Sequence, residues 1–171
     1  MNRKYSEGTS VSSFASREEI ERNLRRFGAD QYLYYARDSY AGIGFSLSGR
    51  QYRLGIDLPD PNDKRFTHTS ARGTRRTAKA AEEEYEKEVR RKWRSLALYI
   101  KAVLVAVDDG ILPIDQALFP FTVLPSGSTV YQTLVPSIDE AYETGVFTVP
   151  MLLSSPEDLP DHKLLEGTDE V

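Results

Sequence analysis

The chain has 171 residues, of which 40% are hydrophobic and 28% charged, and its formal net charge is −4. This length and composition favour one domain with tails. The lack of cysteine excludes disulfides and thiolate metal sites. No apolar run reaches the ~18 residues of a membrane span, and the polar first residues lack the pattern of a signal peptide. We therefore expect a soluble cytoplasmic protein.

Charge is distributed unevenly along the sequence. Residues 1–110 contain 21 Lys and Arg against 16 Asp and Glu, a balance of +5, whereas residues 111–171 contain one Lys against 10 acids, a balance of −9. The basic part is suited to an anionic partner. The alternative interpretation is that the acidic part only offsets a mixed surface and keeps the protein soluble.

The N-terminal region predicts a disordered segment and then a short helix. Residues 1–13 are rich in serine and charge, which favours disorder. Ser16 and Glu19 match a capping box, so we expect Ser16 to be the N-cap. Gly28 is placed to end the helix in a left-handed conformation. The apolar face of this helix would consist of Phe14, Ile20, Leu24 and Phe27.

Three strands are predicted at 31–37, 40–48 and 51–58. The second and third alternate apolar with polar or small residues, which is typical of an antiparallel meander with one covered face. On the other face of the second strand, Gly42, Gly44, Ser46 and Ser48 allow another group to approach closely. We favour a segment of this same protein over a ligand as that group.

Residues 59–76 form the longest predicted loop, which we expect to be basic and flexible. Loops of this length inside a domain are commonly functional or disordered. No acidic residue occurs from Lys64 to Lys79. The loop itself carries Lys64, Arg65, Arg72, Arg75 and Arg76.

One long helix is predicted from Thr77, the candidate N-cap, to Val107. Its apolar residues recur at three- and four-residue steps and therefore share one face. The first half is charged and should project toward solvent or a partner. The second half, 96–107, is apolar on almost every side, which predicts the central core element.

The C-terminal part predicts shorter elements and a tail. We expect a short helix or turn at 111–118, a fourth short strand at 121–124, a helix at 128–144 that Pro136 kinks or splits, and an acidic disordered tail at 154–171. The predicted fold is a single α+β domain at 14–153. In it, a three- or four-stranded antiparallel sheet is covered by one long central helix, with a short N-terminal and a C-terminal helix.

Motifs for known chemistries are incomplete. His68-Thr69-Ser70 matches half of a two-histidine phosphoesterase signature, but the second half fails at His162. Asp57, Asp60 and Asp63 follow a strand, where metal-dependent nucleases often place carboxylates, yet their spacing does not fit those enzymes. We therefore predict no catalytic residue, no metal ligand and no cofactor.

The best candidate site is one for phosphate groups. Basic side chains release counterions when they neutralise a nucleic-acid backbone. Five glutamates at 82–88 interleave with the basic residues of the long helix, so the loop is the better candidate. Arg22, Arg25 and Arg26 of the first helix could join it. The predicted nucleic-acid-binding residues are Lys64, Arg65, Arg72, Arg75, Arg76, Lys79, Arg90, Arg91 and Arg94.

Four segments, ERNLRRFGA at 21–29, NDKRFT at 62–67, RRKWRSLALYIKA at 90–102 and DEAYETG at 139–145, carry a resemblance. They resemble a family of small tailed-phage and prophage accessory proteins that has no settled activity. The likeness spans roughly residues 14–150. It implies an accessory protein of a phage or mobile element in a bacterial host, and it carries over no catalytic residue.

Three functions are open on this sequence. The first is a non-enzymatic protein that binds nucleic acid through the basic loop and helix. The second is a protein-binding module or inhibitor of a host nucleic-acid-handling or defence complex, whose acidic C-terminal third imitates nucleic acid. The third, well behind, is a metal-dependent nuclease that uses Asp57, Asp60 and Asp63.

Overall fold

The computed structural model describes residues 9–37 and 39–147. The chain divides into two units, residues 1–130 and residues 131–171, and each is described by itself. The predicted disordered N-terminus up to residue 8 and the predicted acidic tail at 154–171 lie outside the described residues.

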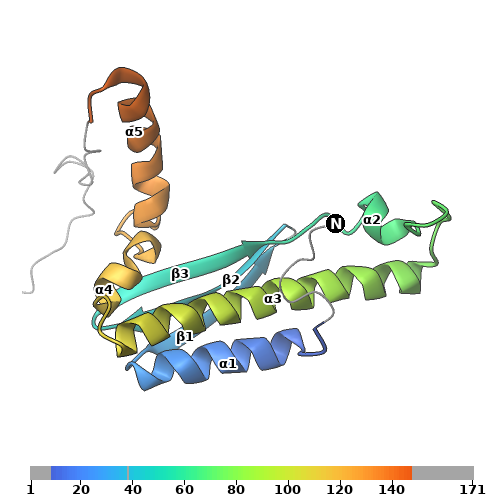
Figure 1. Ribbon diagram of the computed structural model, residues 1–171, viewed down its shortest axis with the longest axis horizontal. Coiled ribbons are helices and arrows are strands. Elements are labelled where there is room, and N and C mark those ends of the chain that lie inside the picture. The colour runs from blue at the N-terminus through green and yellow to red at the C-terminus, as the bar shows by residue number, and fades with distance from the viewer. Residues whose placement is uncertain (1–8, 38, 148–171) are drawn as a thin grey trace, which may run out of the picture. The chain divides into compact units, whose positions relative to one another are not determined.

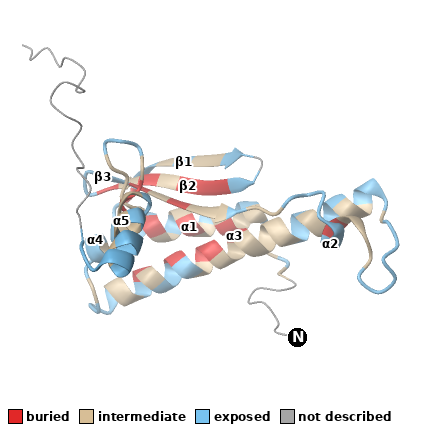
Figure 2. Ribbon diagram, turned by 90° about the horizontal axis from the view of Figure 1, so that it is seen from above, coloured by how far each residue is buried: buried red, intermediate tan, exposed pale blue. Residues whose placement is uncertain are grey.

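The first unit confirms the predicted α+β class. Its elements are α1 (Ser13–Arg26), β1 (Asp30–Arg37), β2 (Tyr40–Leu47), β3 (Arg50–Asp57), α2 (Lys64–Thr67), α3 (Ala78–Asp108), α4 (Ile114–Ala117) and η1 (Phe119–Phe121) (Figure 1). The three strands form an antiparallel meander in the order β1-β2-β3. Helices α1 and α3 lie side by side against one face of this sheet (Figure 2).

The core lies between this face and the two helices. Alternate residues of the strands point into it, because neighbouring residues of a strand face opposite sides. Each fully buried Leu or Ile stabilises the fold by roughly 1.5–3 kcal/mol through removal of apolar surface from water. The buried apolar residues include Ile20 and Leu24 of α1, Ile43, Phe45, Tyr52 and Leu54 of the sheet, and Trp93, Leu96, Ala97, Ile100 and Leu104 of α3.

Helix α1 begins one turn earlier than predicted. Its N-cap is Ser12, whose Oγ accepts a hydrogen bond from the backbone N–H of Ala15 at 3.0 Å. Ser16 is buried inside the helix and donates from its Oγ to the Ser12 carbonyl. The predicted stop is confirmed: Gly28 has φ +88°, and the N–H groups of Gly28 and Ala29 bond back to the last turn.

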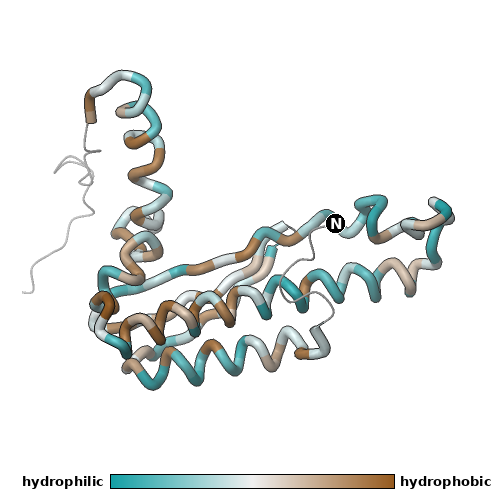
Figure 3. The backbone as a smooth tube through the Cα atoms, viewed as in Figure 1, coloured by the Kyte–Doolittle hydropathy of each residue, from teal (hydrophilic) through white to brown (hydrophobic). Residues whose placement is uncertain are grey.

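Helix α3 confirms the predicted N-cap and the predicted change of character. Thr77 Oγ1 accepts from the N–H of Ala80. The first half is hydrophilic and the second half hydrophobic (Figure 3). Only one side of the second half is buried, however, since Tyr99 and Val105 are 44% and 48% exposed. Helix α3 is therefore a covering helix with one core face and not a helix buried all round.

The predicted fourth strand at 121–124 is absent. Thr122 and Val123 make only isolated bridges, to Tyr52 and Thr129, and the Val123 N–H donates to the Gln51 carbonyl at 2.8 Å. Pro120 and Pro125 flank the segment, and a proline cannot donate to a strand ladder. The sheet therefore has three strands.

The second unit contains most of α5 (Val130–Thr144). The helix continues through Pro136 and is not split. Gly145 has φ +75°, and its N–H bonds to the Ala141 carbonyl, so the helix ends at Thr144, the last residue of the predicted range. Within the described residues, no helix has both the length and the hydropathy to cross a membrane.

Candidate nucleic-acid interface

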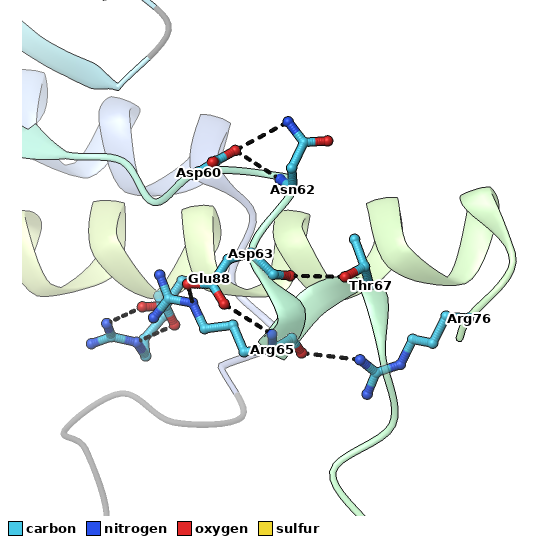
Figure 4. A network of polar contacts seen from close by, with 8 residues as sticks. Asp60, Asn62, Asp63, Arg65, Thr67, Arg76 and Glu88 are labelled. Atoms are coloured by element: carbon cyan, nitrogen blue, oxygen red, sulfur yellow. Dashed lines mark hydrogen bonds and ion pairs between the residues drawn. The ribbon is translucent and has the colours of Figure 1, made fainter. Parts of the chain in front are cut away.

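The predicted basic loop is folded. Residues 59–77, hereafter the basic clip, contain α2 and an antiparallel bridge between His68 and Arg75, so the predicted loop has local structure, and its flexibility stays a prediction. The clip lies over the charged half of α3, beyond the end of the sheet (Figure 1). Its form depends on three sets of contacts, some of which Figure 4 shows.

The first set begins the short helix. Asp60 Oδ1 accepts from the backbone N–H of Asn62 at 2.8 Å, which makes a tight turn. Asp63 is the N-cap of α2: its Oδ1 accepts from the N–H of Arg65 at 3.0 Å, and its Oδ2 lies 3.3 Å from Arg65 Nε. Both aspartates thus organise the backbone of the clip.

The second set anchors the clip to α3. Phe66 is 5% exposed, and its ring meets Tyr85 edge-on, with centroids 5.6 Å apart and planes at 89°. Edge-to-face contact is a favoured arrangement of two aromatic rings. Phe66 is the one large apolar side chain in a segment that is otherwise polar or small. A single buried ring therefore fixes the clip on the helix.

The third set closes the clip on itself. Arg76 Nη1 donates to the backbone carbonyls of Arg65 and Phe66 at 3.0 and 2.9 Å, and also to that of His68. A cation at this position satisfies carbonyl oxygens that the end of a helix leaves without partners. Arg76, one of the predicted binding residues, therefore holds the clip together.

The same contacts direct the other cations outward. The backbone of Thr69 pairs with Thr74, the N–H of Gly73 returns to the Thr69 carbonyl, and Gly73 has φ +62°. Arg72 and Arg75 lie on this exposed turn, and Lys64 and Lys79 are exposed beside it. A concave surface of about 570 Å³ is lined by Lys64, Arg65, His68, Thr69, Ser70 and Gly73.

Two of the three predicted arginines of α3 are paired with acids. Arg91 Nε donates to Glu88 at 2.7 Å, and both side chains are largely buried. Arg94 pairs with Glu19 and so joins α3 to α1. These two arginines therefore stabilise the helices, as the interleaved glutamates of the sequence indicated for this half of α3.

The arginines of α1 lie on a surface of mixed sign. A concavity of about 490 Å³ is lined by Glu18, Glu21, Arg22, Arg25 and Arg26. Arg25 lies 3.6 Å from Glu21, and Arg26 lies 3.9 Å from Asp108. Neighbouring carboxylates weaken the attraction for a phosphate, so α1 is a poorer anion site than the clip.

Among the described residues, the structure shows no group of metal ligands for the nuclease alternative. Asp60 and Asp63 serve the turn and the cap described above. In the part of the chain that the structure describes, no three His, Cys, Asp or Glu side chains come together in an arrangement that could hold a metal ion.

The sequence did not predict that Phe66 anchors the clip on α3, or that Arg76 closes the clip through hydrogen bonds to backbone carbonyls. The signal for the anchor was present, because a lone phenylalanine in a basic segment is a candidate for burial, which removes its apolar ring from water. Comparison with protein families, with curated proteins and with solved structures found no match to this chain.

Proposed function

We propose that this protein binds nucleic acid through the basic clip and carries out no chemistry on it. The observation that carries the proposal is the clip itself. It is a folded basic projection without acids from Lys64 to Lys79, and Lys64, Arg72, Arg75 and Lys79 are exposed on it or beside it. An ordered clip presents its charges without first losing conformational freedom, which favours binding.

The electrostatics of the clip support a phosphate backbone as the partner. Between residues 59 and 79, which comprise the clip and the first two residues of α3, there are six Lys or Arg and two Asp, a balance of +4. Hydroxyl groups of Thr69 and Ser70 lie on the same concave surface as Lys64 and Arg65. Lysine, arginine and hydroxyl side chains are among the groups that contact phosphates in protein–DNA complexes.

The proposed setting is the cytoplasm of a bacterial host, where the protein would act as an accessory of a phage or mobile element. The resemblance of four sequence segments to tailed-phage and prophage proteins supports this setting. Phage and prophage DNA, or its transcripts, would supply the anionic partner.

The test is a fluorescence-anisotropy titration against single- and double-stranded DNA and RNA at 50 and 200 mM salt. If the clip neutralises about three or four phosphates, affinity should fall by roughly 50- to 150-fold over this range. The double variant Arg72→Glu/Arg75→Glu should bind at least tenfold more weakly at low salt. Equal affinity of the variant and the wild type would overturn the proposal.

The matched control is Lys101→Glu on the exposed side of α3, outside the clip. It changes the net charge by the same amount per substitution as each clip variant. It should leave the affinity within about twofold, because salt largely screens the attraction between the nucleic acid and a charge that lies far from it.

A second function is favoured by α5. Tyr131, Ile138 and Tyr142 are 61%, 39% and 89% exposed, and Asp139, Glu140 and Glu143 lie on the same helix. Exposed apolar groups with acids around them suit a partner protein with a basic, partly apolar surface. This function requires a partner whose capture is lost in Ile138→Asp/Tyr142→Asp and kept in Arg72→Glu/Arg75→Glu.

A further inference from the structure

The outer end of the clip is a narrow turn with one long side chain. The turn consists of residues 69–74, and its members other than Arg72 are threonine, serine, alanine and glycine. Residues 70–75 are all exposed. Figure 2 shows this exposed turn at the end of α3 farthest from the sheet. A large partner can therefore approach the side chain of Arg72.

Hydrogen bonds hold the two sides of the turn together. The N–H of Thr69 donates to the Thr74 carbonyl at 2.8 Å, and the N–H of Gly73 donates to the Thr69 carbonyl at 2.9 Å. The N–H of Thr74 also donates to Thr69 Oγ1 at 3.1 Å. Next to them, His68 and Arg75 pair across an antiparallel bridge, in which two backbones lie roughly 4.7–4.9 Å apart. The turn is thus closed by its own backbone and is only two chain segments wide.

The guanidinium at the tip of the turn has a free charge. Among the described residues, the side chains of Arg72 and Arg75 make no hydrogen bond and no ion pair. Arg65 is instead paired with the aspartate that caps α2, and Arg76 is bonded to backbone carbonyls. Two arginines of the clip are therefore available to an anion, and Arg72 is the one on the turn itself.

The surface beside the turn suits a phosphate strand. The concave surface described above is lined by Lys64, Thr69 and Ser70, together with three further residues of the clip. Lysine and hydroxyl side chains are common partners of backbone phosphates, and such contacts fix the position of a protein on a duplex. The turn and the concave surface thus offer two different kinds of contact side by side.

We propose that the clip binds double-stranded DNA, with Arg72 inserted into a narrow, A·T-rich minor groove and the concave surface on one of the two phosphate strands that border this groove. The inference rests on the proposed function and specifies the class of nucleic acid. The minor groove of B-form DNA is about 6 Å wide, which admits a single long side chain. Where the groove is narrow, its negative potential is enhanced and attracts an inserted arginine.

Two other nucleic-acid surfaces suit the turn less well. The major groove of DNA is about 12 Å wide and is read by a helix or a ribbon with several side chains, whereas the turn has one long side chain among small ones. The minor groove of an RNA duplex is wide and shallow, so its phosphates do not converge on an inserted guanidinium. The narrow groove of DNA therefore matches both the shape and the single charge of the turn.

The experiment measures the affinity of wild type for two DNA duplexes of about 16 base pairs and for an RNA duplex of the same length. One DNA duplex has a central run of A·T pairs, and the other has G·C pairs in their place. Wild type should bind the A·T duplex about fivefold or more tightly than the other two, the lower end of the discrimination that one recognised position provides. Netropsin, which occupies the minor groove of A·T-rich DNA, should displace the protein.

The variant Arg72→Lys keeps the charge and removes the guanidinium, which is more weakly hydrated than an ammonium group and so enters a groove at a smaller loss of hydration. Its preference for the A·T duplex should fall below about twofold. Its affinity for the G·C duplex should stay unchanged, because attraction to phosphates depends on charge. Arg75→Lys is the matched control and should keep the preference. Both positions are exposed, and thermal unfolding verifies that each variant is folded.

The outcomes separate this inference from the proposed function. If Arg72→Glu/Arg75→Glu loses binding while wild type binds the A·T and G·C duplexes equally, or while netropsin fails to displace it, only this inference is overturned. The same holds if Arg72→Lys keeps the preference, or if wild type binds the RNA duplex at least as tightly as the A·T duplex. If wild type binds no nucleic acid, both proposals fall.

Discussion

At the scale of single residues, two adjacent arginines of the clip have different tasks. Arg75 lies on the exposed turn, whereas the Arg76 guanidinium is turned back to three carbonyl oxygens. Identical side-chain chemistry thus supplies a free charge at one position and a structural cap at the next. The stability of the clip should depend on Arg76, and its charge toward solvent on Arg75.

Replacing Arg76 with glutamine should loosen the clip. Hydrogen bonds from a charged donor contribute about 1.5–3 kcal/mol each in favourable settings. Because this site is half-buried, we expect the free energy that keeps the clip closed to fall by an amount near the lower figure. Hydrogen exchange at the amides of Thr69 and Gly73 should accelerate by roughly tenfold, while that of Leu54 in the sheet stays slow. Arg75→Gln is the control, and exchange as slow in Arg76→Gln as in that control would contradict the role given to Arg76.

The sequence predicted the basic site as a group but not the tasks of its members. Absence of acids from Lys64 to Lys79 is visible in the sequence, and it identified the clip. Which arginine is turned inward depends on where α2 ends in space, and local sequence does not determine this. The pairing of Arg94 with Glu19 joins residues that are 75 positions apart, which is equally beyond a local pattern.

At the scale of elements, the face of the sheet opposite α1 and α3 combines glycines with tyrosine rings that lie over them. The ring of Tyr35 lies across Gly42, and its hydroxyl donates to the Leu54 carbonyl at 3.3 Å. Aromatic cover of this kind offsets the weak strand propensity of glycine. Glycines that look alike in the sequence should therefore differ in their tolerance of a methyl group.

Gly42→Ala should destabilise the protein by about 1–3 kcal/mol, since the new Cβ collides with the Leu54 backbone as well as with the Tyr35 ring. Gly44→Ala is the matched control on the same strand. Its Cβ meets only ordinary contacts, and alanine loses less backbone entropy, so stability should stay within about 0.5 kcal/mol or rise. Urea unfolding midpoints give the comparison, and equal midpoints would refute it.

Periodicity was sufficient to predict the regular elements and insufficient for the short ones. The alternation in β2 and β3 and the three- and four-residue steps of α3 extend over many residues, so several side chains agree on one face. Helix α2 has four residues and offers no period. It forms because Asp63 caps it and Phe66 is buried against Tyr85, a contact with a residue 19 positions later.

At the scale of the whole first unit, Tyr34 joins all its layers. Its hydroxyl donates to the Arg17 carbonyl of α1 at 3.1 Å, and its ring meets Trp93 of α3 at 6.1 Å. The Arg17 guanidinium lies over both rings. Burial raises the pKa of the Tyr34 phenol well above its ordinary value of 10.0, and the Glu21 carboxylate raises it further.

This raised pKa predicts a loss of stability in alkali. The unfolded phenol ionises near pH 10, and the folded one only at higher pH. The free energy that the protonated Tyr34 phenol contributes to folding is therefore fully present below pH 10. It is lost as the pH rises from there toward the pKa of the folded state. The melting temperature should fall by about 3 °C or more between pH 8 and pH 11. Tyr34→Phe should reduce this fall. The reduction should be partial, because burial also raises the pKa of Tyr32 and Tyr35. An unaltered pH dependence of the melting temperature would exclude Tyr34 as a contributor.

Helix α3 covers the sheet but follows it in the sequence, so the ribosome makes the strands before the helix that covers them. The strands are complete at Asp57, but Leu104, the last buried residue of α3, follows 47 residues later. At ~5–20 residues per second, the apolar face of β2 and β3 waits roughly two to nine seconds for its second helix. Helix α1 is made before the sheet and is available to shield part of this face, so the order of elements along the gene limits the exposure of the nascent chain.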